Sequence, residues 1–230
     1  MFDYSIPPIY WVVRVDSGIT DIAQLSGKPY AAGIAGASST AMVFQTFKAL
    51  GLDDSKLQTG TAEDLTNGVL DKRLIGITKA SGNVELDSQL LTIQASTPIK
   101  LLGLTEAQWK KFQDADPLRA YVRFDLPANT LKALPGHPAI ITQSFITGCQ
   151  GNSDLPQDVA YQMIKVAVST WDEWGAVNWK SNGFYNVVRD QLKDWPASPH
   201  APLHAGTVQF LKEKGVTVPA EFIPPEYKGP

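Results

Sequence analysis

The sequence predicts an α/β protein, in which strands and helices alternate along the chain. Short apolar runs at 10–15, 30–34 and 99–104 have the length and composition of buried strands. Amphipathic segments with helical spacing follow two of these runs, at 41–50 and 105–114. This order of elements favours a parallel, doubly wound sheet.

The first part of the chain predicts two strands with short connections. The run YWVVRV, residues 10–15, is typical of a buried strand, and a helical turn is expected at 20–25. The second strand, 30–34, leads into a helix whose apolar residues recur from Ala41 onward and which is expected to stop at Gly51. A strand, a tight turn and a helix therefore follow one another.

The turn in this unit, AGASST, brings three hydroxyl residues, Ser38, Ser39 and Thr40, to the start of the helix. The first backbone N–H groups of a helix have no intrahelical acceptor, and the helix dipole places partial positive charge there, so these residues suit a carboxylate or a phosphate. The same hydroxyls are also common helix caps, and the sequence matches neither the P-loop GxxxxGK[ST] nor the dinucleotide motif GxGxxG. Both interpretations, cap and anion site, stay open at this point.

Further elements complete one lobe. Thr61 and Asp64 have the spacing of a capping box at the start of a helix expected over 61–71. Another strand is expected at 74–78. After an opening segment that ends at residue 11, we expect residues 12–104 to form one α/β lobe.

The second half has a different character. Residues 105–138 begin with a helix and continue as proline-rich crossover loops, and an apolar run typical of strands follows at 139–147. We expect residues 139–230 to return the chain to another lobe and to end in helices, the last of them near 206–214.

The longest helix is expected over 154–174, with Asp154 as its cap and an apolar stripe that packs on a core. The stripe consists of Val159, Met163, Val166, Ala167 and Trp171.

Composition excludes several classes of protein. The 230 residues carry a formal charge of −3 and no cluster of Lys or Arg, so nucleic acid is not an expected partner. No apolar run approaches the ~20 residues of a membrane helix, and the first residues lack the features of a secretory signal. The single cysteine, Cys149, excludes an intramolecular disulfide.

The sequence gives no support for catalysis or for a metal or cofactor site. His200 and His204 have the spacing of two ligands on a helix, but prolines interrupt any helix there and no Cys, His or acidic cluster accompanies them. His137 is expected in a turn, and Cys149 as a buried small apolar residue. The GxSxG nucleophile motif is absent from the sequence. We therefore expect a binding protein and not an enzyme.

Several stretches resemble the TAXI family of solute receptors of TRAP transporters. They are VVRVDSGITDIAQLSGKPYAAGIAGASST, DLTNGVLD, DLPQDVAYQMIKVAV and PLHAGTVQFLKEKGVTVPAEF. Each is weak alone, but they follow the family's order from Tyr10 to about Tyr227.

The resemblance implies a type II periplasmic-binding-protein fold, with two lobes and a ligand cleft between them. Such receptors are periplasmic, capture a small organic acid or amino acid such as a glutamate-like carboxylate, and deliver it to the membrane subunits of the transporter. The family's GSGT-like loop, and the strand end that faces the cleft, imply ligand contacts at Gly36, Ser38, Ser39, Thr40, Thr78 and Ser81.

The chain also departs from the family pattern. Its loop reads GASST in place of GSGT, which adds Cβ atoms near the ligand. Family members carry a signal peptide and a long segment upstream of the first match. We therefore expect either that the chain is a truncated copy of a longer receptor, with part of the first lobe missing, or else that it associates with itself through its C-terminal half. Two other functions share the fold: a ligand-sensing or regulatory module, and a thiamine-pyrimidine-synthase-like enzyme, whose cysteine-rich iron motif one cysteine does not supply.

Overall fold

The computed structural model describes residues 2–5, 7–82, 85–116, 120–145, 147–149, 151–170, 173 and 202–229. The chain divides into two compact units. Unit 1 contains Met1–Ile6 and Ile146–Pro230, and unit 2 contains Pro7–Phe145. The segment boundaries expected after residues 104 and 138 both fall inside unit 2, because the strands that follow them join the same sheet.

Unit 2 is built on a seven-stranded sheet. Its strands are β2 (Pro8–Arg14), β3 (Tyr30–Ile34), β4 (Leu57–Gly60), β5 (Gly76–Ala80), β6 (Ile99–Leu102), β7 (Val122–Leu126) and β8 (Ile140–Ser144). The order across the sheet is β4-β3-β5-β2-β8-β7, with β6 also paired to β2. The strands expected at 10–15 and 30–34 are confirmed, the strand expected at 74–78 lies two residues later, and β4 has no counterpart in the expectations.

The sheet is mixed, so the expectation of an all-parallel sheet is wrong. Only β3 pairs in parallel, with β4 and β5, whereas β2 is antiparallel to β5, β6 and β8. Strand β7 is antiparallel to β8. A parallel neighbour needs a long crossover, usually a helix, and the connection between β7 and β8 contains none.

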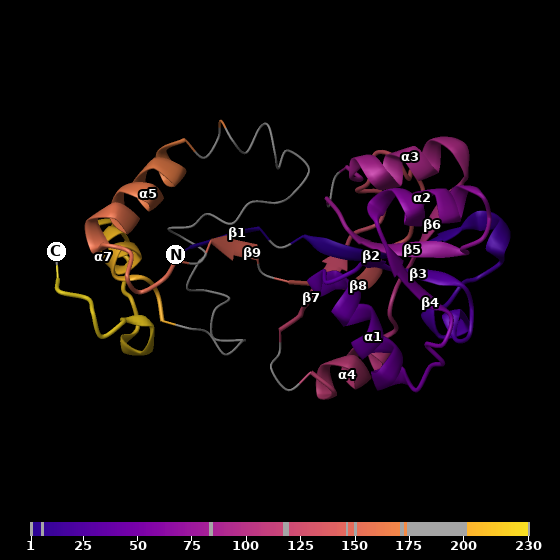
Figure 1. The fold of residues 1–230 in the computed structure, drawn as a ribbon, viewed down its shortest axis with the longest axis horizontal. Helices are drawn as coiled ribbons and strands as arrows, with labels where there is room; N and C mark the ends of the chain where they lie inside the picture. Colours follow the sequence, from indigo (N-terminus) through magenta and orange to yellow (C-terminus); the bar gives the residue numbers. More distant parts are fainter. Residues whose placement is uncertain are drawn as a thin grey trace. The chain divides into compact units, whose positions relative to one another are not determined.

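Helices cover both faces of this sheet (Figure 1). They are α1 (Ser38–Leu50), α2 (Ala62–Leu70), α3 (Ser88–Ser96) and α4 (Glu106–Asp114). One core contains residues of α2 and α3, and the other contains residues of α1 and α4. The three layers confirm the α/β fold class.

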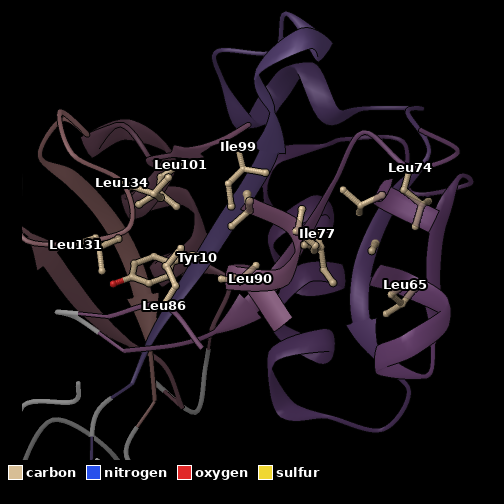
Figure 2. Close-up of a cluster of buried hydrophobic side chains, with 14 of the residues drawn as sticks. Tyr10, Leu65, Leu74, Ile77, Leu86, Leu90, Ile99, Leu101, Leu131 and Leu134 are labelled. Atoms are coloured by element: carbon tan, nitrogen blue, oxygen red, sulfur yellow. The ribbon is translucent and has the colours of Figure 1, made fainter. Parts of the chain in front are cut away.

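Strand β2 supplies both cores. All seven of its residues are buried, and alternate side chains point to opposite faces of the sheet. Tyr10 and Val12 join the core beneath α2 and α3, part of which Figure 2 shows, while Trp11 and Val13 join the core beneath α1 and α4. This strand is therefore the centre of unit 2.

Two helices begin where the sequence predicts them, and the first has the expected cap. The Thr61 side chain accepts a hydrogen bond from the backbone N–H of Asp64, at the start of α2. Thr105 and Gln108 form a complete capping box at the start of α4. Helix α3 was not expected from the sequence; it begins after Asp87, whose side chain accepts from the N–H of Leu90.

The connection between β7 and β8 is folded around His137, which is buried. Its Nε2 accepts the backbone N–H groups of Thr130 and Leu131, at 3.0 and 3.1 Å. Nδ1 therefore carries the proton, which it donates to the carbonyl of Pro138 at 2.8 Å. The expectation of a turn histidine is confirmed, and the imidazole serves as the acceptor that orders the loop.

Unit 1 contains a two-stranded antiparallel sheet of β1 (Phe2–Ser5) and β9 (Thr147–Cys149). The apolar run expected at 139–147 is therefore two strands, β8 and β9, that belong to different units. The side chain of Cys149 lies outside what the structure describes.

Unit 1 also contains a packed helix pair, α5 (Gln157–Ser169) and α7 (Ala205–Glu213). Pro156 is the N-cap of α5, so the expected cap, Asp154, lies before the helix. The helix ends earlier than expected, and Trp171 and Trp174 lie outside the described residues.

The expected apolar stripe of α5 is not its buried face. Val159, Met163 and Val166 are exposed, and the buried residues are Ala160 and Ile164. The reason is a close contact between the two helices: a Cβ added at Gly206 of α7 would lie 2.4 Å from the backbone of α5 and 2.8 Å from the Cβ of Ala160. Small residues, and not the large apolar ones, allow the two backbones to approach. Among the described residues, no helix has the length and apolar character that a membrane crossing requires.

We predict that Gly76→Ala destabilises unit 2. A Cβ at Gly76 would lie 2.0 Å from the carbonyl oxygen of Val12, in the centre of the sheet, where the backbone has no room to shift. The free energy of unfolding should fall by about 3 kcal/mol or more in chemical denaturation. Gly60→Ala is the matched control, because a Cβ there meets only side-chain atoms at 3.6 Å or more. Equal effects of the two substitutions would contradict the close approach at Gly76.

We also predict that His137→Ala destabilises the protein by about 2–4 kcal/mol, because it leaves two largely buried backbone N–H groups without their acceptor. Chemical denaturation measures this loss. Lys132→Ala in the same loop is the control, since that side chain is 69% exposed and should matter little. An unfolding curve for His137→Ala that matches the wild type would exclude the structural role of the ring.

Candidate functional site

The candidate site lies where parallel strands β3 and β5 end at one edge of the sheet. Ala31 of β3 pairs with Ile77 of β5, so their carboxyl ends face the same way. In open α/β sheets, ligands bind at this edge, outside the ends of the strands. The turn from β3 into α1 is located here.

The start of α1 differs from the sequence expectation in its cap. Ala37 is the N-cap, with an extended backbone, and no side chain caps the helix. Gly36 precedes it with φ +81°, a left-handed conformation that glycine adopts without strain. Ser38 and Ser39 are therefore the first two helical residues and not the caps.

The first helical N–H groups remain available at this turn. The N–H of Thr40 and that of Ala41 both donate to the carbonyl of Ala37. For the N–H groups of Ser38 and Ser39, and for their hydroxyls, the described part of the chain provides no acceptor or partner. Gly36 and Ser38 are exposed and Ser39 is half-buried. These groups together can bind an anion.

Thr40 has a different role from the two serines. It is buried, and its hydroxyl donates to the carbonyl of Ile34 at 2.7 Å. A Cβ at Gly33 would lie 2.6 Å from this hydroxyl oxygen, so a side chain at position 33 would clash with Thr40. The Thr40 side chain therefore holds the end of β3 against the start of α1.

Thr78 and Ser81 lie at the end of β5, next to this turn, but their side chains point into the protein. The Thr78 hydroxyl lies 2.9 Å from the hydroxyl of Tyr30, and its side chain is buried. The Ser81 hydroxyl accepts the backbone N–H of Asp87 at 2.7 Å, which orders the entry to α3. Both side chains thus have internal hydrogen bonds.

Two residues at this edge were not expected from the sequence. The hydroxyl of Tyr121 donates to the carbonyl of Ser38 at 2.8 Å. Burial, and secondarily the nearby Asp116 carboxylate, raise the pKa of Tyr121, so it stays a donor at neutral pH. Ile34 is 40% exposed and adds an apolar surface beside the turn. Tyr121 belongs to no motif, and only the folded chain brings it to Ser38.

The electrostatics of the turn come from the backbone. Residues 31–47 contain no acidic or basic side chain. The partial positive charge at the start of α1 is therefore not opposed by a carboxylate of the turn or of the helix itself. An anionic group of a small molecule is the natural partner of such a site.

The other polar candidates show internal roles. His204 is the N-cap of α7: its Nδ1 accepts the N–H of Gly206, and its Nε2 lies 3.0 Å from the carbonyl of Leu155. His200 lies outside the described residues. In the described ranges, no group of three His, Cys, Asp or Glu side chains is arranged to hold a metal ion.

Comparison with protein families gives one match. The model of the NMT1-like family covers residues 1–215, nearly the whole chain. A comparison with curated proteins finds no matching sequence. The mixed sheet with helices on both faces is consistent with the periplasmic-binding-protein-like fold of this family. The chain therefore belongs to the NMT1-like family, a periplasmic-binding-protein-like family.

Proposed function

We propose that this protein is an extracytoplasmic solute receptor of a TRAP transporter, of the TAXI type. It captures a small organic acid or amino acid and delivers it to the membrane subunits of the transporter. The observation that carries the proposal is the uncapped start of α1, with its free N–H groups and two hydroxyls at the ligand edge of a binding-protein lobe.

A carboxylate fits this site better than a neutral or cationic ligand. The N–H groups and hydroxyls of Ser38 and Ser39 are donors, and charge-assisted hydrogen bonds to carboxylate oxygens are roughly twice as strong as neutral ones. The exposed Ile34 provides an apolar contact for the carbon chain of the same ligand. A glutamate-like amino acid or another small carboxylate has both parts.

The proposed role is binding without chemical conversion. The hydroxyl of Thr40 donates to a backbone carbonyl, and the ring nitrogens of His137 and His204 lie at hydrogen-bond distance from backbone groups. None of these groups is arranged as a nucleophile with a base within hydrogen-bond reach. We expect the ligand to be released unchanged, and NMR of the recovered ligand tests this.

Calorimetry of the full chain tests the ligand class. The probes are L-glutamate, other small mono- and dicarboxylates, and for each one the uncharged amide analogue. We expect saturable binding of at least one carboxylate and none of its amide. Binding of the amide as tightly as the acid would exclude an anion site. Failure of all carboxylates, with binding of a cationic or neutral solute, would contradict the proposed ligand class.

The transport role needs a separate experiment. Proteoliposomes that contain the membrane subunits of a TRAP transporter should take up the bound carboxylate only when the receptor is added. Cell fractionation should find the receptor outside the cytoplasmic membrane. Ligand binding without any stimulation of uptake would favour a sensing module with the same fold.

We predict that Ser39→Ala weakens carboxylate binding by about 1–3 kcal/mol, the range for a lost hydrogen bond to a charged group. Its unfolding free energy should stay close to that of the wild type, because the Ser39 hydroxyl has no partner among the described residues. Thr40→Val is the matched comparison: it removes the hydroxyl that holds Ile34 and should lower stability. Unchanged affinity in Ser39→Ala, measured by calorimetry, would remove Ser39 from the site.

We also predict that Tyr121→Phe weakens carboxylate binding by less than Ser39→Ala. The substitution removes the hydrogen bond to the carbonyl of Ser38 but leaves the donors to the ligand in place. The expected loss is about 0.5–1.5 kcal/mol, measured by calorimetry. Tyr227→Phe, which removes a phenol hydroxyl of unit 1, is the control and should bind as the wild type does. A larger loss for Tyr121→Phe than for Ser39→Ala would indicate that the phenol contacts the ligand directly.

A further inference from the structure

Unit 2 has a hollow on a part of the sheet that the ligand turn does not include. It has a volume of about 500 Å³ and lies among the end of β6, the start of α4, and strands β7 and β8. Apolar residues line much of it, among them Leu104, Leu126, Ile140 and Ile141. Its size is within the range of ordinary binding sites.

Three charged residues form the polar side of this hollow. The guanidinium of Arg123 donates to both carboxylate oxygens of Glu106, at 2.7 and 2.8 Å. It also donates to both oxygens of Asp125, through Nε at 2.9 Å to each. Arg123, Glu106 and Asp125 together therefore carry a net charge of −1.

The geometry favours a cationic partner over an anionic one. Arg123 is already paired with two carboxylates, so an anion has to displace one of them. The Glu106 and Asp125 side chains are 72% and 65% exposed and keep free lone pairs for an incoming donor. The hydrogen bonds from Arg123 lower the pKa of Glu106, so this carboxylate is ionised at neutral pH.

Strand β7 adds a main-chain surface next to the hollow. It pairs with β8 on one side, and no other strand of the described chain pairs with its outer side. An edge strand presents unpaired N–H and carbonyl groups that can pair with an extended peptide. Arg123 and Asp125 are alternate residues of β7, so they project on the same face, toward the hollow they line.

We propose that β7 and this hollow form a docking surface for an extended segment of a partner protein. The segment carries a lysine or arginine side chain and, two residues away, an apolar side chain. Its backbone pairs with β7, its cation contacts Glu106 and Asp125, and its apolar side chain enters the hollow. A second copy of this chain would bring the same surplus of negative charge to the rim, which opposes self-docking there. The proposal is independent of the ligand at α1.

NMR titration of the full, ¹⁵N-labelled chain tests this surface. The probe is the acetylated and amidated peptide Thr-Lys-Thr-Leu-Thr, in which the Lys and Leu side chains lie on one face of an extended strand. We expect saturable shifts of the amides at 103–106 and 122–126. The peptide with Glu in place of Lys should not bind. Added salt should weaken binding of the Lys peptide.

Variants of the two carboxylates test whether their charges contribute to peptide binding. Glu106→Gln combined with Asp125→Asn should weaken binding of the Lys peptide by about fivefold, since two exposed ion pairs are lost. Asp114→Asn, at the other end of α4 and also exposed, is the matched control and should bind as the wild type does. The amide spectrum of each variant shows directly that it is folded.

The outcomes separate the proposal from its alternatives. The proposal is supported if the Lys peptide binds saturably, the Glu peptide does not bind, and the double variant binds the Lys peptide more weakly. No binding of the Lys peptide at millimolar concentration overturns it, as does equal binding of the Glu peptide or no effect of the double variant. Butylammonium binding as tightly as the peptide would indicate a small-cation site instead. Concentration-dependent self-association that involves 122–126 would indicate a second copy as the occupant.

Discussion

Everything in unit 2 depends on β2, a strand buried on both faces and paired on both edges. Residues 9–13 pair with β5, and the other edge pairs with β6 and β8. Its alternate side chains supply both hydrophobic cores, and none of its seven residues is exposed. Gly76 of β5 is required for the same reason, because the backbone of β2 leaves no room for a Cβ there. The ligand turn is positioned through this centre, because β3 pairs with β5 and β5 pairs with β2.

The α1 turn shows how donors can be kept free beside a well-packed core. Thr40, Thr78 and Ser81 have internal hydrogen bonds that fix the ends of β3 and β5. Since Ala37 occupies the cap position, the helix start is left without a side-chain acceptor. A serine or aspartate there would satisfy an N–H group internally and compete with an anion. The fixed turn and the uncapped helix together form a donor site that is organised before a ligand arrives.

Local patterns predicted much of this fold, and long-range contacts account for what they missed. The apolar runs of β2 and β3, the caps at Thr61 and Thr105, and the stop at Gly51 are all encoded within a few residues. Strand direction is not, because it depends on which distant strand becomes the neighbour. The buried face of α5 was missed because Gly206, distant in sequence, allows close approach at Ala160. The Tyr121 contact joins residues 83 positions apart and leaves no local signal.

A series of buried hydrogen bonds connects β2, β8 and α1, so β8 helps to position α1. The indole N–H of Trp11 donates to Gln143 at 2.8 Å, and the Gln143 amide donates to the hydroxyl of Thr46 at 3.1 Å. Thr46 in turn donates to the carbonyl of Met42, so β2, β8 and α1 share one continuous network of buried hydrogen bonds. An unpaired group in such a network is costly, which favours a single arrangement of the three elements.

That network lies close to the points where the chain leaves unit 2. Pro8 pairs with Ser144, and the Ser144 hydroxyl donates to the carbonyl of Pro7. The chain enters the unit at Pro7 and leaves it after Phe145, so both crossings lie on one pair of hydrogen-bonded strands. The same strands that complete the core therefore also carry the covalent connection to unit 1, and Gln143 ties them to the helix whose first residues form the proposed anion site.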